Sequence, residues 1–105
     1  MENRKTRSGE NIKILILDTA DNKKISVGLK INNRKHILTQ KIMSNKTQIV
    51  LPMIDKILKE HKVGLGEIQE IDVNVGPGSF TGIRVGMAIA NSLSFTLKIP
   101  VKTIK

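Results

Sequence analysis

The sequence predicts an α/β fold with the element order βββαβαβ, in which two helices pack on one face of a five-stranded mixed sheet. Apolar residues alternate with polar ones over 25–31, which predicts a half-buried strand. Apolar residues recur at helical spacing over 49–61, which predicts a helix. A glycine-rich turn at 76–78 then separates a further strand from a second helix. Strand–helix–strand units require parallel pairing, so two parallel strands should extend an antiparallel meander.

The first third of the chain accounts for the meander. Residues 12–17, IKILIL, are short, apolar and β-branched, which favours a buried central strand. Asp21-Asn22 predicts a turn before the alternating strand. Asn32-Asn33 predicts a tight hairpin, because Asn tolerates a positive φ. The third strand should then run from Arg34 to Met43.

The rest of the chain predicts two crossovers. The first helix should cover 47–61, capped by Thr47, Ser44 or Asn45 and stopped at Gly64. A fourth strand should cover 71–75. Ser79 should cap a second helix over 80–97, and a fifth strand should begin at 99. This order is that of a ribonuclease-H-like or actin-like ATPase lobe.

Length and composition place the chain in a broad class. It has 105 residues, which predicts one domain. Residues 1–10 are almost entirely polar, so we expect a disordered leader followed by one lobe over 11–105. Cysteine is absent, which excludes disulfides and thiolate metal sites. No apolar run is long enough to span a membrane, and a cytoplasmic protein is the expectation.

The net charge of +9 has two interpretations. A basic chain can present a surface to nucleic acid. The basic residues are scattered along this sequence, however, and the only aromatic residues of the Phe, Trp and Tyr class are two phenylalanines. Single-strand binders stack bases on such side chains. Compositional drift toward lysine is therefore the interpretation we favour over a dedicated RNA surface.

The glycine-rich turn has a structural and a functional interpretation. A turn entering a helix can direct backbone N–H groups and the helix dipole at an anion. The segment is not a Walker A loop, and it misses the dinucleotide fingerprint by one residue. A tight turn before a capped helix is the interpretation we favour. The residues of this phosphate or turn site are Asp18, Thr19, Gly76, Gly78 and Ser79.

The second helix carries small residues at four-residue spacing, a stripe along which another helix can approach closely. Two glycines within a helix cost about 2 kcal/mol of helix propensity, which close packing would offset. We expect an interface with a partner or a second copy; a contact with the first helix alone is the other interpretation. The residues expected at the interface are Ile49, Met53, Gly82, Arg84, Gly86, Ala90 and Ser94.

Residues 76–86, GPGSFTGIRVG, resemble the GPGSFTGLRIG pattern of the TsaB (YeaZ) family. Asp18-Thr19-Ala20 and the helix start over 47–54 continue the similarity, which extends over about 12–104. Two departures stand out. Lys46-Thr47-Gln48 replaces the usual His-Ser-Glu, and Ala20 replaces a serine. Family members are considerably longer, so their second lobe has no counterpart here.

The resemblance implies a non-catalytic scaffold subunit with an actin-like fold. Its implied partner is a TsaD-like catalytic subunit, with TsaE in the larger assembly, and a homodimer is expected when the chain is alone. The implied process is threonylcarbamoylation of the adenosine next to the anticodon of tRNA. Contact with tRNA is expected to be indirect or weak. No cofactor, metal or membrane is implied.

Four other functions compete with this one. A metalloprotease is disfavoured because His36 and His61 lie on different expected elements without an HExxH motif. A two-metal nuclease needs several converging carboxylates, and only Asp18 sits at a central strand end. A nucleotide-binding ATPase-like lobe and a basic RNA-binding module remain as alternatives.

Overall fold

The computed structural model describes residues 12–42 and 45–105. The expected leader at 1–10 and the expected strand end at Met43 lie outside these residues. The predicted order βββαβαβ is confirmed, with one added 3₁₀ turn. No helix in the described residues is long and apolar enough to cross a membrane. The elements are β1 (Lys13–Asp18), β2 (Lys24–Ile31), β3 (Arg34–Lys41), α1 (Lys46–Glu60), η2 (Leu65–Glu67), β4 (Glu70–Asn74), α2 (Phe80–Leu97) and β5 (Val101–Ile104).

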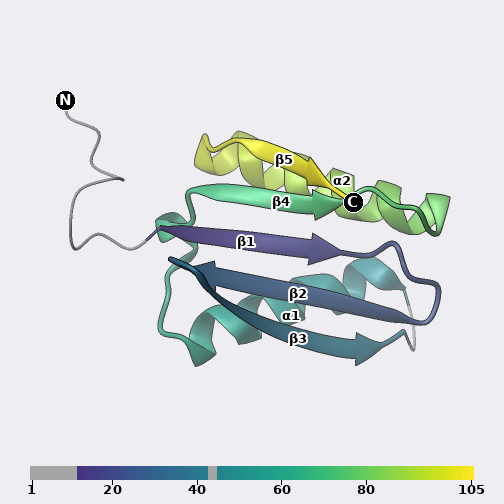
Figure 1. Cartoon of the computed structure of the whole chain (residues 1–105), viewed down its shortest axis with the longest axis horizontal. Helices are drawn as coiled ribbons and strands as arrows, with labels where there is room; N and C mark the ends of the chain where they lie inside the picture. Colours follow the sequence, from purple (N-terminus) through teal and green to yellow (C-terminus); the bar gives the residue numbers. More distant parts are fainter. Residues whose placement is uncertain (1–11, 43–44) are drawn as a thin grey trace.

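The strands form one mixed sheet in the order β3-β2-β1-β4-β5. The β1–β2 and β2–β3 pairs are antiparallel, whereas β1–β4 and β4–β5 are parallel. Both helices lie behind the sheet in Figure 1, with α1 behind β2 and β3 and α2 behind β4 and β5. The other face of the sheet carries no helix among the described residues, and we call it the helix-free face.

The core lies between the sheet and the two helices. Odd-numbered residues of the central strands point into it and are fully buried, because successive strand side chains alternate between faces. Six residues of α1 close the core from the other side at helical spacing. The strand residues are Leu15, Leu17, Ile25, Val27, Leu29, Ile71 and Val73. The α1 residues are Ile49, Val50, Met53, Ile54, Ile57 and Leu58.

Helix boundaries follow local capping, with one correction. Asn45 caps α1 through its side chain, which accepts from the backbone N–H groups of Thr47 and Gln48. The expected stop at Gly64 is wrong, because α1 already ends at Glu60. Lys62 takes the left-handed conformation, with a φ of 55°, in place of a glycine. The turn at Asn32 is confirmed, since its φ is 58°.

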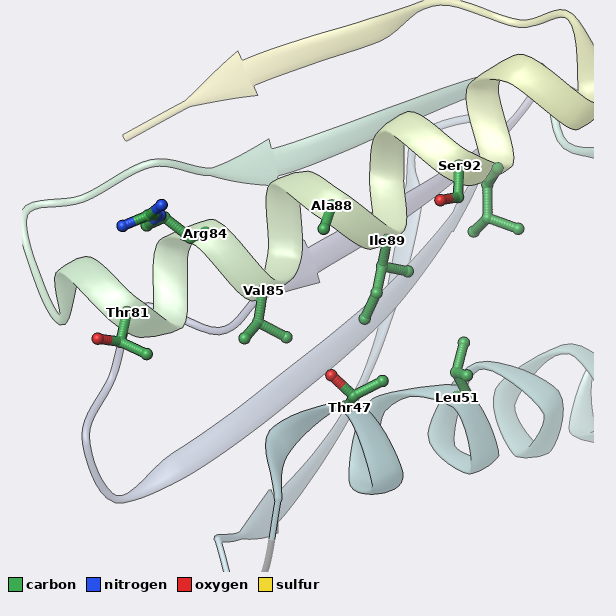
Figure 2. A pocket seen from close by; sticks show the side chains of 9 residues that line it. Thr47, Leu51, Thr81, Arg84, Val85, Ala88, Ile89 and Ser92 are labelled. Atoms are coloured by element: carbon green, nitrogen blue, oxygen red, sulfur yellow. The ribbon is translucent and has the colours of Figure 1, made fainter.

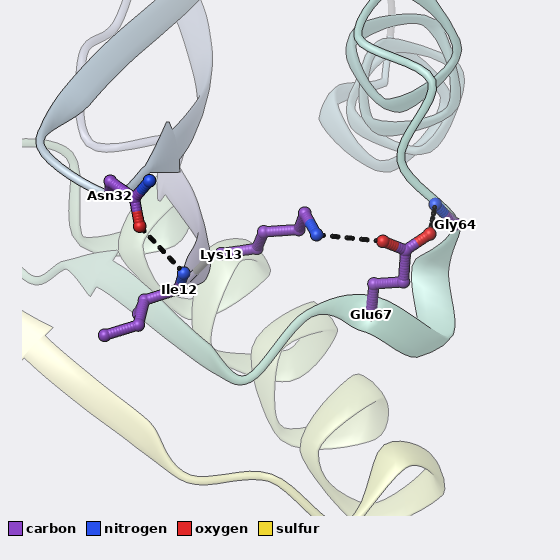
Figure 3. A network of polar contacts seen from close by, with 5 residues as sticks. All are labelled: Ile12, Lys13, Asn32, Gly64 and Glu67. Carbon is purple, nitrogen blue, oxygen red and sulfur yellow. Dashed lines mark hydrogen bonds and ion pairs between the residues drawn. The ribbon is translucent and has the colours of Figure 1, made fainter. Parts of the chain in front are cut away.

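A small polar network fixes the start of β1 (Figure 3). Lys13 Nζ lies 2.9 Å from Glu67 Oε1, and the backbone N–H of Gly64 donates to the other carboxylate oxygen at 2.9 Å. These contacts, the Gly64 hydrogen bond first, lower the pKa of Glu67. On the opposite side, the N–H of Ile12 donates to the Asn32 side chain at 3.1 Å. The network therefore connects η2 and the β2–β3 turn to the N-terminal end of β1.

Candidate functional site

The loop from Gly76 to Ser79 seats the N-terminus of α2 against the end of β1. Ser79 Oγ accepts from the N–H of Gly82 at 3.0 Å, which confirms the predicted N-cap. The N–H of Ser79 donates to the carbonyl of Ala20 at 2.6 Å. Gly76 has a φ of 116°, a conformation that L side chains rarely adopt. The glycine-rich segment is thus a tight turn between β4 and α2, held by hydrogen bonds to Ala20 and within the helix cap.

The stripe of small residues on α2 faces the sheet. A Cβ on Gly82 would overlap the carbonyl of Thr19, and a Cβ on Gly86 would lie 2.5 Å from Thr19 Oγ1. The fully buried Thr19 hydroxyl also donates to the Gly82 carbonyl at 2.5 Å. Both glycines are therefore needed for the close approach of α2 to the end of β1. Ala90 is fully buried, and the half-buried Ser94 donates to the carbonyl of Ile99.

These positions bear on the expected interface, which stays a prediction. Gly82, Gly86 and Ala90 are buried inside the chain, as are Ile49 and Met53 in the α1 core stripe. A partner cannot reach buried side chains without unfolding the lobe. Two of the seven expected residues remain accessible: Arg84 is exposed, and Ser94 is half-buried at the end of α2.

An apolar groove of about 690 Å³ separates the two helices on their outer side (Figure 2). Its rim includes the exposed residues Thr47, Thr81, Arg84 and Ser92. Leu51 is half exposed on the α1 side of the groove. The other lining residues are Val85, Ala88, Ile89 and Leu93. We call this surface the helix groove.

Sequence reasoning missed most of the helix groove for a physical reason. The helix α2 is apolar on more than one side, and the sequence does not show which side the sheet occupies. Leu51, Val85 and Ala88 could have been found as the apolar positions left over once the buried side of each helix is assigned. Phe80, with 74% of its surface exposed, lies beside the groove residue Arg84, whose guanidinium carbon is 5.7 Å from the ring centre.

The proposed phosphate or turn site is a shallow polar pocket of about 390 Å³. Asp18, Asp21, Gly78 and Ser79 all contribute to its lining. Asp21 accepts hydrogen bonds from the N–H groups of Lys23 and Lys24, and the Lys23 bond is the main cause of its lowered pKa. Two carboxylates beside the helix N-terminus repel an anion, so the geometry favours the turn over the phosphate site.

Lys46 stands where the family usually has a histidine, and it ties the start of α1 to this loop. Its Nζ donates to the carbonyls of Thr19 at 3.0 Å and Asp21 at 3.2 Å. A Cβ on Gly82 would also collide with this amine. The lysine therefore ties the start of α1 to the loop after β1, close to Gly82 of α2.

Metal ligands do not gather within residues 12–42 and 45–105, where no cluster of three or more His, Cys, Asp or Glu side chains could hold an ion. The two histidines lie on different elements, as expected, at β3 and at the end of α1, and their rings are in contact. The rings of His36 and His61 lie 4.1 Å apart between centroids, tilted by 37°. His61 Nδ1 contacts the carbonyl of Ile57 at 3.0 Å. This pair packs the end of α1 against β3.

A carboxyl pair occupies the helix-free face. Asp72 on β4 has its pKa raised to about 6, first by burial and then by its hydrogen bond and charge interaction with Glu70. Its Oδ1 atom is buried without a hydrogen-bond partner. Lys102 and Lys30 lower the same pKa and so partly offset these effects. Asp72 therefore changes its protonation near pH 6 and lies outside the helix groove.

Comparison with known proteins agrees with this geometry. A family model described as "TsaD: tRNA N6-adenosine threonylcarbamoyltransferase" matches residues 13–105. The Haemophilus influenzae tRNA threonylcarbamoyladenosine biosynthesis protein TsaB is 38% identical over 92 residues, which are 88% of this chain and 39% of that protein. The TsaB protein of Buchnera aphidicola subsp. Baizongia pistaciae is 41% identical over 75 residues, 71% of this chain and 34% of that protein.

Solved structures give the same result. YeaZ from Pseudomonas aeruginosa superposes with a TM-score of 0.81 at 32% identity, covering 90% of this chain and 43% of that one. Thermus thermophilus RuvC, at a TM-score of 0.54 and 8% identity, shows the ribonuclease-H-like fold alone. The chain thus spans well under half the length of these TsaB and YeaZ relatives. On its motif, fold and sequence similarity, this chain belongs to the TsaB (YeaZ) family.

Proposed function

We propose that this chain is a non-catalytic scaffold lobe that docks through the helix groove onto a TsaD-type catalytic subunit in the cytoplasm. The reaction it supports is threonylcarbamoylation of the adenosine next to the anticodon of tRNA, with a TsaE-type protein in the larger assembly. When the catalytic subunit is missing, a second copy of the chain occupies the same groove. The family membership supports the process, and the helix groove supports the docking.

The helix groove is the observation that carries the proposal. Its floor is apolar, its rim carries hydroxyl groups and the Arg84 guanidinium, and Leu51 remains 50% exposed. An apolar centre with a polar rim is the usual composition of a protein interface. A groove between two helices accepts an apolar helix face of a partner. A paralogous catalytic subunit with the same lobe would present such a helix pair.

Leu51→Glu tests the docking directly. We expect it to weaken binding to the cognate catalytic subunit at least tenfold, because a desolvated charge would face the apolar floor of the groove. Leu51 is exposed enough for the fold to survive, and circular dichroism checks this. Ile37→Glu is the matched control: Ile37 is 53% exposed on the helix-free face. Isothermal titration should show a loss of affinity for the first variant only. Equal affinities for both variants and the parent chain would sink the proposal.

The hydrogen bonds already made by the polar groups of the strand-end pocket support a non-catalytic role. Asp18 Oδ1 accepts from the N–H of Ala20 at 3.2 Å, and Asp21 is held by the N–H groups of Lys23 and Lys24. These carboxylates shape the loop. ATP turnover by the purified chain that disappeared in Asp18→Ala would contradict this role and favour the ATPase-like alternative.

A further inference from the structure

Four lysines lie in two cross-strand pairs on the helix-free face of the β2–β3 hairpin. The antiparallel register places Lys24 opposite Lys41 and Lys30 opposite Lys35. Between these pairs, Ser26 Oγ lies 3.0 Å from Thr39 Oγ1, and Ile37 covers Gly28. Side chains directly opposite each other in a ladder share a face. We call this surface the lysine face.

The charge on this hairpin is one-sided. No carboxylate occurs between Asp21 and Asp55 in the sequence. The Lys and Arg residues of that stretch are Lys23, Lys24, Lys30, Arg34, Lys35, Lys41 and Lys46. Within the described residues, the ion pairs join Lys13 to Glu67 and Lys59 to Asp55, away from the lysine face. Basic residues that look scattered along the sequence are therefore gathered by the hairpin register.

Such an arrangement costs stability in the free protein. Like charges directly opposite each other in an antiparallel pair are destabilising, and two such pairs repeat on one face here. Because the opposite side of β2 faces the core, burial alone would keep lysines off that side; what points to a ligand is that the two lysine pairs stand directly opposite each other in the ladder. A ligand with closely spaced negative charges would turn the repulsion into attraction. The two pairs are six residues apart along β2, or about 20 Å at strand rise, which spans several phosphates of one nucleic-acid strand.

The rest of the helix-free face limits the footprint. Ile14 and Ile16 on β1 lie beside Lys30 and Gly28, and Glu70 and Asp72 follow on β4. Those carboxylates repel phosphate, so a polyanion is confined to the hairpin. The lysine face carries no aromatic ring for base stacking, which favours contact with the backbone rather than the bases.

We propose that the lysine face binds the phosphate backbone of tRNA directly. The choice of tRNA rests on the proposed function, whereas the choice of a nucleic-acid backbone rests on the charge pattern. Binding is insensitive to base sequence and falls steeply with salt, because each lysine–phosphate contact releases counterions. The surface lies on the sheet face opposite the helix groove, so the lobe holds the catalytic subunit and tRNA at the same time.

The test compares two variants of equal net charge by fluorescence anisotropy with labelled tRNA. The first carries Lys24→Gln, Lys30→Gln, Lys35→Gln and Lys41→Gln. The control carries Lys56→Gln, Lys59→Gln, Lys62→Gln and Lys98→Gln, exposed lysines on or next to the helices. We expect the first variant to bind at least tenfold more weakly at low salt. Its log–log salt slope should fall by about three, close to one for each lost phosphate contact, while the control stays near the parent chain.

Further readouts separate the outcomes. The lysine-face variant should melt at the same or a higher temperature, since it removes two repulsive pairs, and it should bind the catalytic subunit normally. Equal losses of tRNA binding in both variants would mean that net charge alone acts, which overturns the proposal. If anionic lipid vesicles or poly-glutamate bind as tightly as tRNA or more tightly, the surface takes another class of polyanion, and the proposal is overturned. If the parent chain binds tRNA but does not bind the catalytic subunit, the proposed function is rejected and the lysine face is not.

Discussion

The two sides of α2 show how differently an internal contact and a docking surface are encoded. The side facing the sheet has Gly82 and Gly86, where the chain at the end of β1 leaves no room for a Cβ, followed by the buried Ala90. The outer side has Arg84 and Ala88 along the helix groove, at the same four-residue spacing but with mixed size and polarity. The conspicuous pattern therefore belongs to the fold, and the docking surface is made of ordinary residues.

The largest effect should come from filling the inner side. Gly86→Leu should destabilise the lobe by about 3 kcal/mol, because its side chain would collide with Thr19 Oγ1 and press on Val73. Gly86→Ala should cost less and still destabilise, although alanine has the higher helix propensity. Urea unfolding measures both. Ala88→Leu, on the exposed side of the same helix, is the control and should stay within about 0.5 kcal/mol of the parent chain.

Either glycine variant matching the parent chain in stability would mean that α2 does not approach β1 as closely as described. Loss of partner binding in Gly86→Ala with unchanged stability would place the stripe at the interface after all. These outcomes separate an internal from an external role for the same helix side.

A smaller effect is expected at the hydroxyl that faces the stripe. Thr19→Val keeps the shape of the side chain but removes the donor to the Gly82 carbonyl. The buried carbonyl would lose this bond, at a cost of about 1 to 2 kcal/mol. Thr81→Val, on the exposed rim of the helix groove, is the matched control. Thermal unfolding should separate the two; equal melting temperatures would show that the Thr19 hydroxyl adds nothing.

The smallest stability effect concerns the helix-free face and depends on pH. The folded-state pKa of Asp72 is raised from 3.8 to about 6. The folded state thus holds this proton more tightly than the unfolded chain, and stability is lost as the pH rises through about 6. Asp72→Asn should remove that loss and stabilise the lobe at pH 7 to 8 by about 1 kcal/mol, after allowance for solvent screening.

Melting temperatures measured from pH 4 to 8 check this prediction. The Asp72→Asn profile should be flatter than that of the parent chain between pH 4 and 6. A parent chain that gains stability as the pH rises through 6, with Asp72→Asn removing the gain, would reverse the sign and refute the assignment.

The sequence predicted the fold more fully than the site. The helix Phe80–Leu97 was predicted with these bounds, because the Ser79 cap marks its start. The end of α1 was predicted to within one residue, but its stop signal was missed, because Lys62, a residue with no special preference for positive φ, takes the left-handed position in place of a glycine. The interface residues stay a prediction, and most of them are buried within the lobe because helical spacing gives a period and not an orientation. Only Arg84 and Ser94 of that set remain accessible, and pairing register alone revealed the lysine face.

Photo-crosslinking tests the central claim, docking through the helix groove, most directly. A photoreactive amino acid would replace Ser92 on the rim of the groove or, in a parallel sample, Ile37 on the helix-free face, both exposed positions. Each sample would be irradiated with the cognate catalytic subunit and analysed by mass spectrometry. The proposed docking predicts a covalent heterodimer from position 92 and none from position 37. A heterodimer formed from position 37 alone would contradict it and place the partner on the opposite face of the sheet.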